Sequence, residues 1–272
     1  MNSLARSRGL RDSRSVFDAR LHPAGLTDQD LETLRLFGVE GALVVSDATP
    51  HAQPDQLLAH FEELVSKELP RLERAGIRAW AALGVHPASV PRRGLSHVLE
   101  ALPAFCKGGR VVAVGLIGLS KGDLAEVEAL GEQLALAERL HLRAVITSPA
   151  HEREALTRRV LTLLKESSIP PGHVLVDCAT ARTVKLIREC GHWAGLTMHP
   201  DHLEVEKAVS LVCQLGPERL VLESAAGDGA SELLAVARAV HRLQKAKLTR
   251  SVVARVSEDN ATAFLGVQLA HA

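Results

Sequence analysis

The sequence predicts an α/β fold, a (β/α)8 TIM barrel formed by a single domain. Eight short apolar runs alternate with longer amphipathic runs, and this alternation is typical of parallel strands joined by helices. The apolar runs show no polar face, which is expected of parallel strands buried on both sides. A doubly wound open sheet is the alternative, but the segment DARLHPAGLTD after the first run lacks the glycine-rich fingerprint of that fold.

The expected strands and helices follow one another in strict order. The strands are residues 15–22, 41–47, 78–87, 111–119, 143–150, 173–179, 193–200 and 219–227. The helices are residues 27–38, 54–76, 95–109, 122–141, 151–168, 180–191, 201–216, 229–247 and 249–266. Thr27 and Asp55 are suited to capping the first two helices, Gly38 ends the first, and Pro70 predicts a kink in the second.

The domain organisation follows from the same pattern. Residues 1–14 are basic and rich in serine, without an apolar core, so we expect a flexible tail rather than a secretory signal. Residues 15–272 contain no linker or low-complexity run, and we expect one barrel domain there.

Composition argues against several classes of partner and compartment. Lys plus Arg equals Asp plus Glu, at 32 each, and aromatic residues make up 3% of the chain. Neither value gives a strong signal for nucleic-acid binding, and no apolar run is long enough to cross a membrane. The four cysteines form no CxxC pair. We therefore expect reduced thiols and a cytoplasmic protein.

Polar residues collect where the expected strands end. The carboxyl ends of barrel strands are where chemistry takes place in this architecture. His22, His86 and His199 stand at three such ends. Each alone is best explained as a histidine that hydrogen-bonds a loop carbonyl, but three at converging positions indicate a pocket.

Short motifs at these ends make the sequence similar to a known family. In chain order they are DARLH (18–22), LGVHP (83–87), AVGLIGLS (113–120), VITSPA (145–150), VDCAT (176–180), GLTMHP (195–200), RLVLESAAG (219–227) and NATAFLG (260–266). Together they resemble the TatD-related metal-dependent hydrolases of the amidohydrolase superfamily. The resemblance extends from Val16 to about Gly266 and implies a TIM barrel.

The resemblance also implies six metal ligands, most of which are replaced here. The family has two histidines on strand one, a glutamate on strand four, histidines on strands five and six, and an aspartate on strand eight. The corresponding residues are Arg20, His22, Leu116, Thr147, Cys178 and Ala225. His22 is the only unchanged ligand, and Cys178 is a possible one.

Physical chemistry indicates that the metal site is lost and not merely built from different ligands. A hydrolytic zinc needs about three protein ligands and an open position for water. Leu116 and Ala225 offer no donor atom. The Arg20 guanidinium keeps its charge, and a dication ~4 Å away would be repelled by roughly 8 kcal/mol at an effective dielectric constant of ~20. We therefore expect no cofactor.

Arg20 has two alternative explanations. Because strand side chains alternate, Asp18, Arg20 and His22 are expected to share a face, with Glu223 and Ala225 facing them from strand eight. Arg20 would then pair with Asp18, Glu223 or both. Alternatively, Arg20 binds a small anion in a pocket completed by the residues His22, His86, Thr147, Ser148 and His199.

The predicted function is that of a pseudoenzyme, a hydrolase-like barrel retained as a binding, scaffold or regulatory protein. Its partner is an unknown protein or a small anionic ligand. The predicted vestigial pocket consists of Asp18, Arg20, His22, His86, Leu116, Thr147, Cys178, His199, Glu223 and Ala225.

Two catalytic alternatives stay open. One is a metal-dependent hydrolase of phosphodiester or related bonds, with zinc or another divalent metal held by the remodelled set His22, His86, Cys178 and His199. The other is metal-free catalysis, with Cys178 as a nucleophile.

Overall fold

The computed structural model describes residues 15–48, 53–148 and 151–269. Eight parallel strands pair in chain order. They are β1 Val16–Leu21, β2 Val39–Val45, β3 Arg78–Ala82, β4 Val111–Gly118, β5 Arg143–Thr147, β6 Val174–Val176, β7 Trp193–Thr197 and β8 Leu220–Glu223. The last strand returns to the first, where the His22 backbone N–H donates to the Ala226 carbonyl at 2.9 Å. The predicted TIM barrel is thus confirmed as a near-closed sheet.

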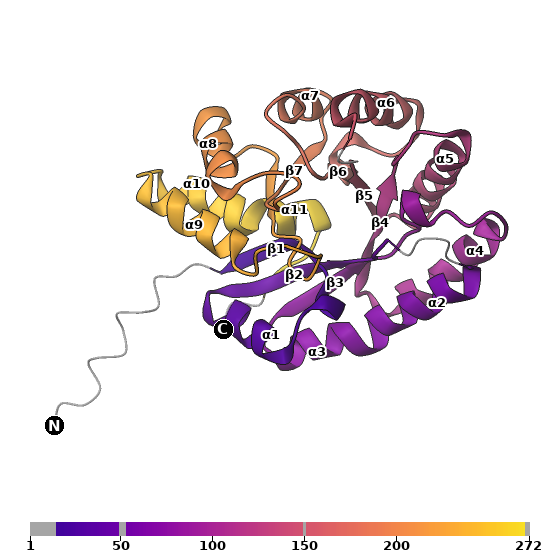
Figure 1. The fold of residues 1–272 in the computed structure, drawn as a ribbon, viewed down its shortest axis with the longest axis horizontal. Helices are drawn as coiled ribbons and strands as arrows, with labels where there is room; N and C mark the ends of the chain where they lie inside the picture. Colours follow the sequence, from indigo (N-terminus) through magenta and orange to yellow (C-terminus); the bar gives the residue numbers. More distant parts are fainter. Residues whose placement is uncertain (1–14, 49–52, 149–150, 270–272) are drawn as a thin grey trace.

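The helices surround this sheet (Figure 1). They are α1 Asp28–Leu36, α2 Pro54–Glu63, α3 Leu69–Arg74, α4 Leu95–Phe105, α5 Leu124–Arg139, α6 Arg153–Glu166, α7 Val184–Glu189, α8 Val205–Leu215, α9 Ala235–Lys245, α10 Arg250–Ala254 and α11 Asn260–Leu265. In the described part of the chain, none of them is both long and apolar enough to traverse a lipid bilayer. The expected tail, residues 1–14, and the end of the expected fifth strand, residues 149–150, lie outside the described residues.

The second expected helix is divided by one wider turn. A π-helical turn, Leu64–Glu68, joins α2 to α3 without leaving the helical path. Pro70 follows directly, at the beginning of α3. Proline has no N–H and its ring crowds the carbonyl four residues earlier, so a wider turn before it relieves both problems. At the place where the sequence predicts a kink, the structure has this π turn, which ends two residues before Pro70.

Two buried layers hold the barrel together. The larger packs the outer strand residues against the helices, with members such as Leu31 and Val44. The second fills the barrel interior and includes Phe17, Leu43 and Leu116, and Phe264 of α11 packs against it. Apart from the irregular positions of some strands, alternate residues face opposite layers, so both faces of the sheet are apolar.

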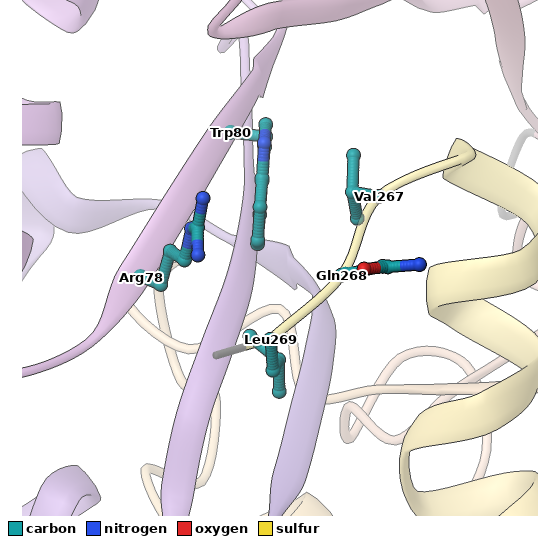
Figure 2. Close-up of a pocket in the computed structure, with 5 residues that line it drawn as sticks. All are labelled: Arg78, Trp80, Val267, Gln268 and Leu269. Atoms are coloured by element: carbon teal, nitrogen blue, oxygen red, sulfur yellow. The ribbon is translucent and has the colours of Figure 1, made fainter. Parts of the chain in front are cut away.

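A shallow cavity of about 380 Å³ is lined by Arg78 and Trp80 of β3 and by residues 267–269, which follow α11 (Figure 2). Because β3 begins at Arg78, this cavity lies toward the amino-terminal end of the strands. Trp80, the middle residue of β3, stacks on Phe17 with ring centroids 5.9 Å apart. The guanidinium of Arg78 lies 5.3 Å from the centre of the Trp80 ring. Active sites of this fold lie at the opposite, carboxyl-terminal end, so this cavity is separate from the candidate site.

β1 contains an irregularity that decides which side chains enter the barrel. Asp18 pairs with Ala42 and Leu21 pairs with Val44, so three steps along β1 match two steps along β2. This bulge inserts an extra residue and re-aims the following side chains. Simple alternation, which placed Asp18 and Arg20 on one face, is therefore wrong for this strand.

Candidate functional site

Arg20 lies at the centre of the polar residues inside the barrel mouth. Its side chain is almost fully buried, with 6% exposed. Nε donates to Nε2 of His22 at 3.2 Å and Nη1 donates to Sγ of Cys178 at 3.4 Å. Three positions that the motifs assign to metal ligands, on strands one and six, thus meet around a guanidinium.

His22 is fixed by two partners. Its Nδ1 forms a hydrogen bond with Oδ1 of Asp47, just after β2, while its Nε2 accepts from Arg20. This arrangement assigns the proton to Nδ1 and the lone pair to Nε2. Burial would raise the pKa of Asp47, but the hydrogen bond from His22 and the positive charge of Arg20 bring it below its usual range. The lone pair that a metal would need is therefore engaged by Arg20.

Two further carboxyl groups lie buried beside the guanidinium. Asp177 Oδ2 is 3.7 Å from Nη1 of Arg20, and Glu223 accepts a hydrogen bond from the hydroxyl of Thr197. Both acids are fully buried. Burial raises the pKa of Asp177 to about 7, although Arg20 draws it down. Burial, with Asp177 nearby, also raises the pKa of Glu223 well above its ordinary value.

The partners of Arg20 differ from those expected. The Asp18 carboxylate accepts hydrogen bonds from the Ser224 backbone and hydroxyl, and from the backbone N–H of Arg20 at 3.3 Å. Glu223 contributes long-range attraction. The acids that lie within 4 Å of the guanidinium are Asp177 and Asp228, the latter at 3.9 Å from Nη2. The expected Arg20–Asp18 pair is wrong because the bulge directs the two side chains apart.

Residues at the other implied ligand positions are buried without joining this cluster. Leu116 belongs to the apolar interior of the barrel. Ala225 lies just past β8, where its N–H donates to the Arg20 carbonyl at 3.0 Å. Thr147 ends β5 and is 7% exposed. Ser148, expected near an anion, lies 3.3 Å from the hydroxyl of Thr157 instead.

His86 and His199 organise loops. Nδ1 of His86 accepts from the Ala88 N–H at 3.1 Å, and Nδ1 of His199 accepts from the Asp201 N–H at 3.1 Å. Burial, together with Arg20 and His22, lowers the pKa of His86 to about 4. Within the described residues, no hydrogen bond or ring contact joins His22, His86 and His199 to one another. His199 is linked to the site through the loop after β8, because its Nε2 donates to the Asp228 carbonyl at 3.2 Å.

Cys178 is enclosed rather than presented to solvent. Its side chain is buried, its φ is +55°, and its N–H donates to the Thr197 hydroxyl at 2.9 Å. A catalytic thiolate needs access to its substrate. The Cys178 sulfur instead accepts a hydrogen bond from Arg20.

Comparison with known proteins identifies the family. The family model for TatD related DNase matches residues 17–266. The chain belongs to this family. A relative from Methanocaldococcus jannaschii, named as an uncharacterized metal-dependent hydrolase, is 29% identical over 225 residues, which cover 82% of this chain and 88% of the relative.

Solved structures agree with the TatD assignment. The TatD-like protein of Archaeoglobus fulgidus is 28% identical and superposes with a TM-score of 0.79, covering 92% of this chain and all of that one. The TatD homolog YJJV of Escherichia coli is 21% identical, with a TM-score of 0.69 and coverage of 93% and 98%. At that lower identity the likeness concerns the fold.

The divalent ion implied by the TatD family does not fit the residues present. Leu116 and Ala225 have no donor atom, and the His22 lone pair faces a guanidinium. Across residues 15–48, 53–148 and 151–269, no three His, Cys, Asp or Glu side chains are grouped to hold a metal ion. Metal coordination distances are near 2.0–2.3 Å, whereas the donors here stand around Arg20 at the distances of hydrogen bonds and ion pairs.

The sequence pattern does not single out Asp228, which the structure places opposite Arg20. Asp228 lies between β8 and α9, and α9 begins at Ala235, six residues later than the expected helix at 229. The DG pair at 228–229 is a turn signal. This turn signal predicts a longer loop after the eighth strand, which would place Asp228 at the mouth of the barrel.

Proposed function

We propose that this TatD-family barrel does not carry out metal-dependent hydrolysis and acts as a binding, scaffold or regulatory protein, a pseudoenzyme. The observation that carries the proposal is the set of side chains at the implied ligand positions. Leu116 and Ala225 are fully buried without a donor atom, and Arg20 adds a permanent positive charge. A metal-bound water would find neither the ligands that ionise it nor a carboxylate at position 225 to receive its proton.

Metal analysis of the purified protein tests this proposal. The wild type and His22→Ala would be incubated with Zn²⁺ or Mn²⁺, desalted and measured by mass spectrometry. We expect well under one metal ion per chain in both proteins. One ion per wild-type chain that is lost in His22→Ala would overturn the proposal, because His22 is the only unchanged ligand.

The second candidate function is hydrolysis of phosphodiester or related bonds by a remodelled metal site. Membership of the TatD family and the name of the Methanocaldococcus jannaschii relative favour it. An assay with bis(p-nitrophenyl) phosphate and added Mn²⁺ or Zn²⁺ separates the two functions. Turnover that EDTA abolishes and that His22→Ala lacks would support the hydrolase.

A binding role calls for a ligand, and we propose a small anion as one that Arg20 would attract. Nη2 of Arg20 faces the half-exposed Asp228 carboxylate at 3.9 Å. An incoming anion would compete with that carboxylate, so Asp228→Asn should strengthen phosphate binding in calorimetry.

A protein partner is the alternative. The four cysteines are free thiols, which suits the cytoplasmic location that we propose.

A further inference from the structure

The guanidinium of Arg20 is surrounded by groups that attract a cation. Nε2 of His22, Sγ of Cys178, Oδ2 of Asp177 and Oδ2 of Asp228 lie 3.2, 3.4, 3.7 and 3.9 Å from its nitrogens. We call these four side chains the guanidinium cage. They come from the end of β1, the end of β6 and the loop after β8, so the cage connects parts of the chain that are distant in sequence.

The cage matches a planar organic cation better than a metal ion. Its members surround all three nitrogens of one guanidinium: His22 lies at Nε, Cys178 and Asp177 at Nη1, and Asp228 at Nη2. The first two accept hydrogen bonds, and the two carboxylates lie at ion-pair distances. A zinc ion would need the same groups to converge to about 2.0–2.3 Å from one point. The guanidinium is too wide for the cage groups to come that close to a single point.

Charge balance explains why the cation remains buried. Burial disfavours the charged guanidinium, but Cys178, Asp177, Glu223 and Asp228 outweigh it and hold the pKa of Arg20 above its ordinary value. Conversely, Asp177 is fully buried beside Arg20, and its side chain interacts with the buried carboxyl group of Glu223. Without Arg20, the pKa of this buried acid would rise further, because Arg20 is the cation that lowers it, and removing one partner of a buried ion pair is destabilising.

We infer that the guanidinium of Arg20 takes the place of a bound cation in this barrel. The guanidinium cage, formed by His22, Cys178, Asp177 and Asp228, binds it, and the stability of the fold depends on its charge instead of on a metal ion. This inference goes beyond the proposed loss of hydrolysis, because it states what holds the ligand positions on strands one and six together. It also predicts that, when the Arg20 side chain is removed by mutation, the cage binds alkylguanidinium ions.

Chemical rescue tests the inference. Arg20→Ala should lower the melting temperature by about 10 °C, the effect expected when a buried ion pair is broken in a domain of this size. Methylguanidinium chloride should then raise the melting temperature of Arg20→Ala relative to methylammonium chloride at equal ionic strength. The wild type should show no such difference, because its cage is filled.

A matched arginine provides the control. Arg78 lies over Trp80 at the other end of the barrel (Figure 2) and is exposed. Arg78→Ala should show no specific response to methylguanidinium. An equal response of Arg78→Ala and Arg20→Ala would mean a general effect of the salt and would overturn the inference.

Two more variants keep the test decisive if Arg20→Ala does not fold. Arg20→Met keeps the length of the side chain without its charge, and Arg20→Lys keeps the charge without the fork. We expect Arg20→Met to be the less stable of the two, with both below the wild type. Arg20→Met as stable as the wild type would overturn the inference, because the cage would not need a cation.

The metal arm distinguishes this inference from the proposed function. EDTA should leave the melting temperature of the wild type unchanged, and Zn²⁺ or Mn²⁺ should stabilise Arg20→Ala less than methylguanidinium does. If a metal ion stabilised Arg20→Ala more than methylguanidinium does, the inference about Arg20 would be overturned. The proposed function would not be affected, because the metal content of the wild type tests it separately.

Discussion

A Cβ atom on Gly195 would lie 2.6 Å from Cδ of Glu223, because the Glu223 side chain crosses the inner face of β7 at that residue. Real Cβ atoms do not approach other atoms so closely. Gly195 therefore allows the buried carboxyl group of Glu223 to reach the hydroxyl of Thr197, two residues further along β7.

Gly195→Ala should destabilise the protein. The new methyl group has to displace a fully buried side chain, and overpacking of this kind costs about 1–3 kcal/mol. Urea unfolding measures the loss. Gly131→Ala is the control, since a methyl group on this residue of α5 would have no neighbour within 4 Å, and there alanine should add about 0.5–1 kcal/mol of stability. Equal effects at the two sites would contradict the steric explanation.

Asp18 should make stability depend on pH. Burial raises the pKa of Asp18 to about 6 in spite of its hydrogen bonds with Ser224, while an unfolded aspartate has a pKa near 3.9. The folded state therefore binds a proton that the unfolded state has released between these values. The stabilisation is complete below about pH 4 and is lost as the pH rises through about 6.

The comparison with Asp18→Asn isolates this effect. The difference in unfolding free energy, wild type minus variant, should fall by about 2 kcal/mol between pH 4 and pH 7. Other titrating groups are common to both proteins and cancel. Urea titrations at several pH values would measure the difference, and a value independent of pH would rule out the raised pKa.

Arg71 should anchor the segment that leads from β1 to α1. Its guanidinium donates to the Pro23 carbonyl at 3.0 Å, to the Leu26 carbonyl, and to the carboxylates of Asp28 and Glu68 at 2.6 and 2.9 Å. Arg71→Ala should cost roughly 2 kcal/mol, since it removes hydrogen bonds from a charged donor. Hydrogen exchange should speed up locally in residues 23–28. Arg92→Ala, at an exposed arginine, should leave that segment unchanged.

Asn260, in the closing NATAFLG motif, should act through its amide donors. Its Nδ2 donates to the carbonyls of Pro217 and Leu220 at 2.6 and 2.7 Å, which ties α11 to the beginning of β8. Asn260→Ala should cost roughly 2 kcal/mol. Asn260→Asp should cost more, because a carboxylate would face two carbonyl oxygens in a buried place. Thermal unfolding ranks the variants, and a milder effect of Asn260→Asp would refute this role.

The alternation of apolar and amphipathic runs sufficed to predict the barrel, because each strand needs two apolar faces and each helix one. The same property hides the bulge in β1. Where both faces of a strand are buried, an extra residue leaves no gap in the hydrophobic pattern. The opposite placement of Asp18 and Arg20 was therefore beyond sequence reasoning.

The candidate site was predictable to the extent that it depends on strand ends. Arg20, His22 and Cys178 do meet, as the motif positions imply. The loop partners Asp47 and Asp228 could not be assigned in the same way, because loop geometry places them. His86 and His199 each accept a hydrogen bond from the backbone of their own loop, and His199 also reaches the Asp228 carbonyl, so their place in the pocket stays a prediction.

The extra residue in β1 also bears on how such a protein can diverge. Asp18 is tied to Ser224 across the junction of the first and last strands, while the residue at position 20 projects into the interior. Mutations at position 20 can thus exchange one inner functional group for another without breaking the junction. In β1, the residue before the bulge holds the sheet closed, and the residue after it determines the chemistry of the interior.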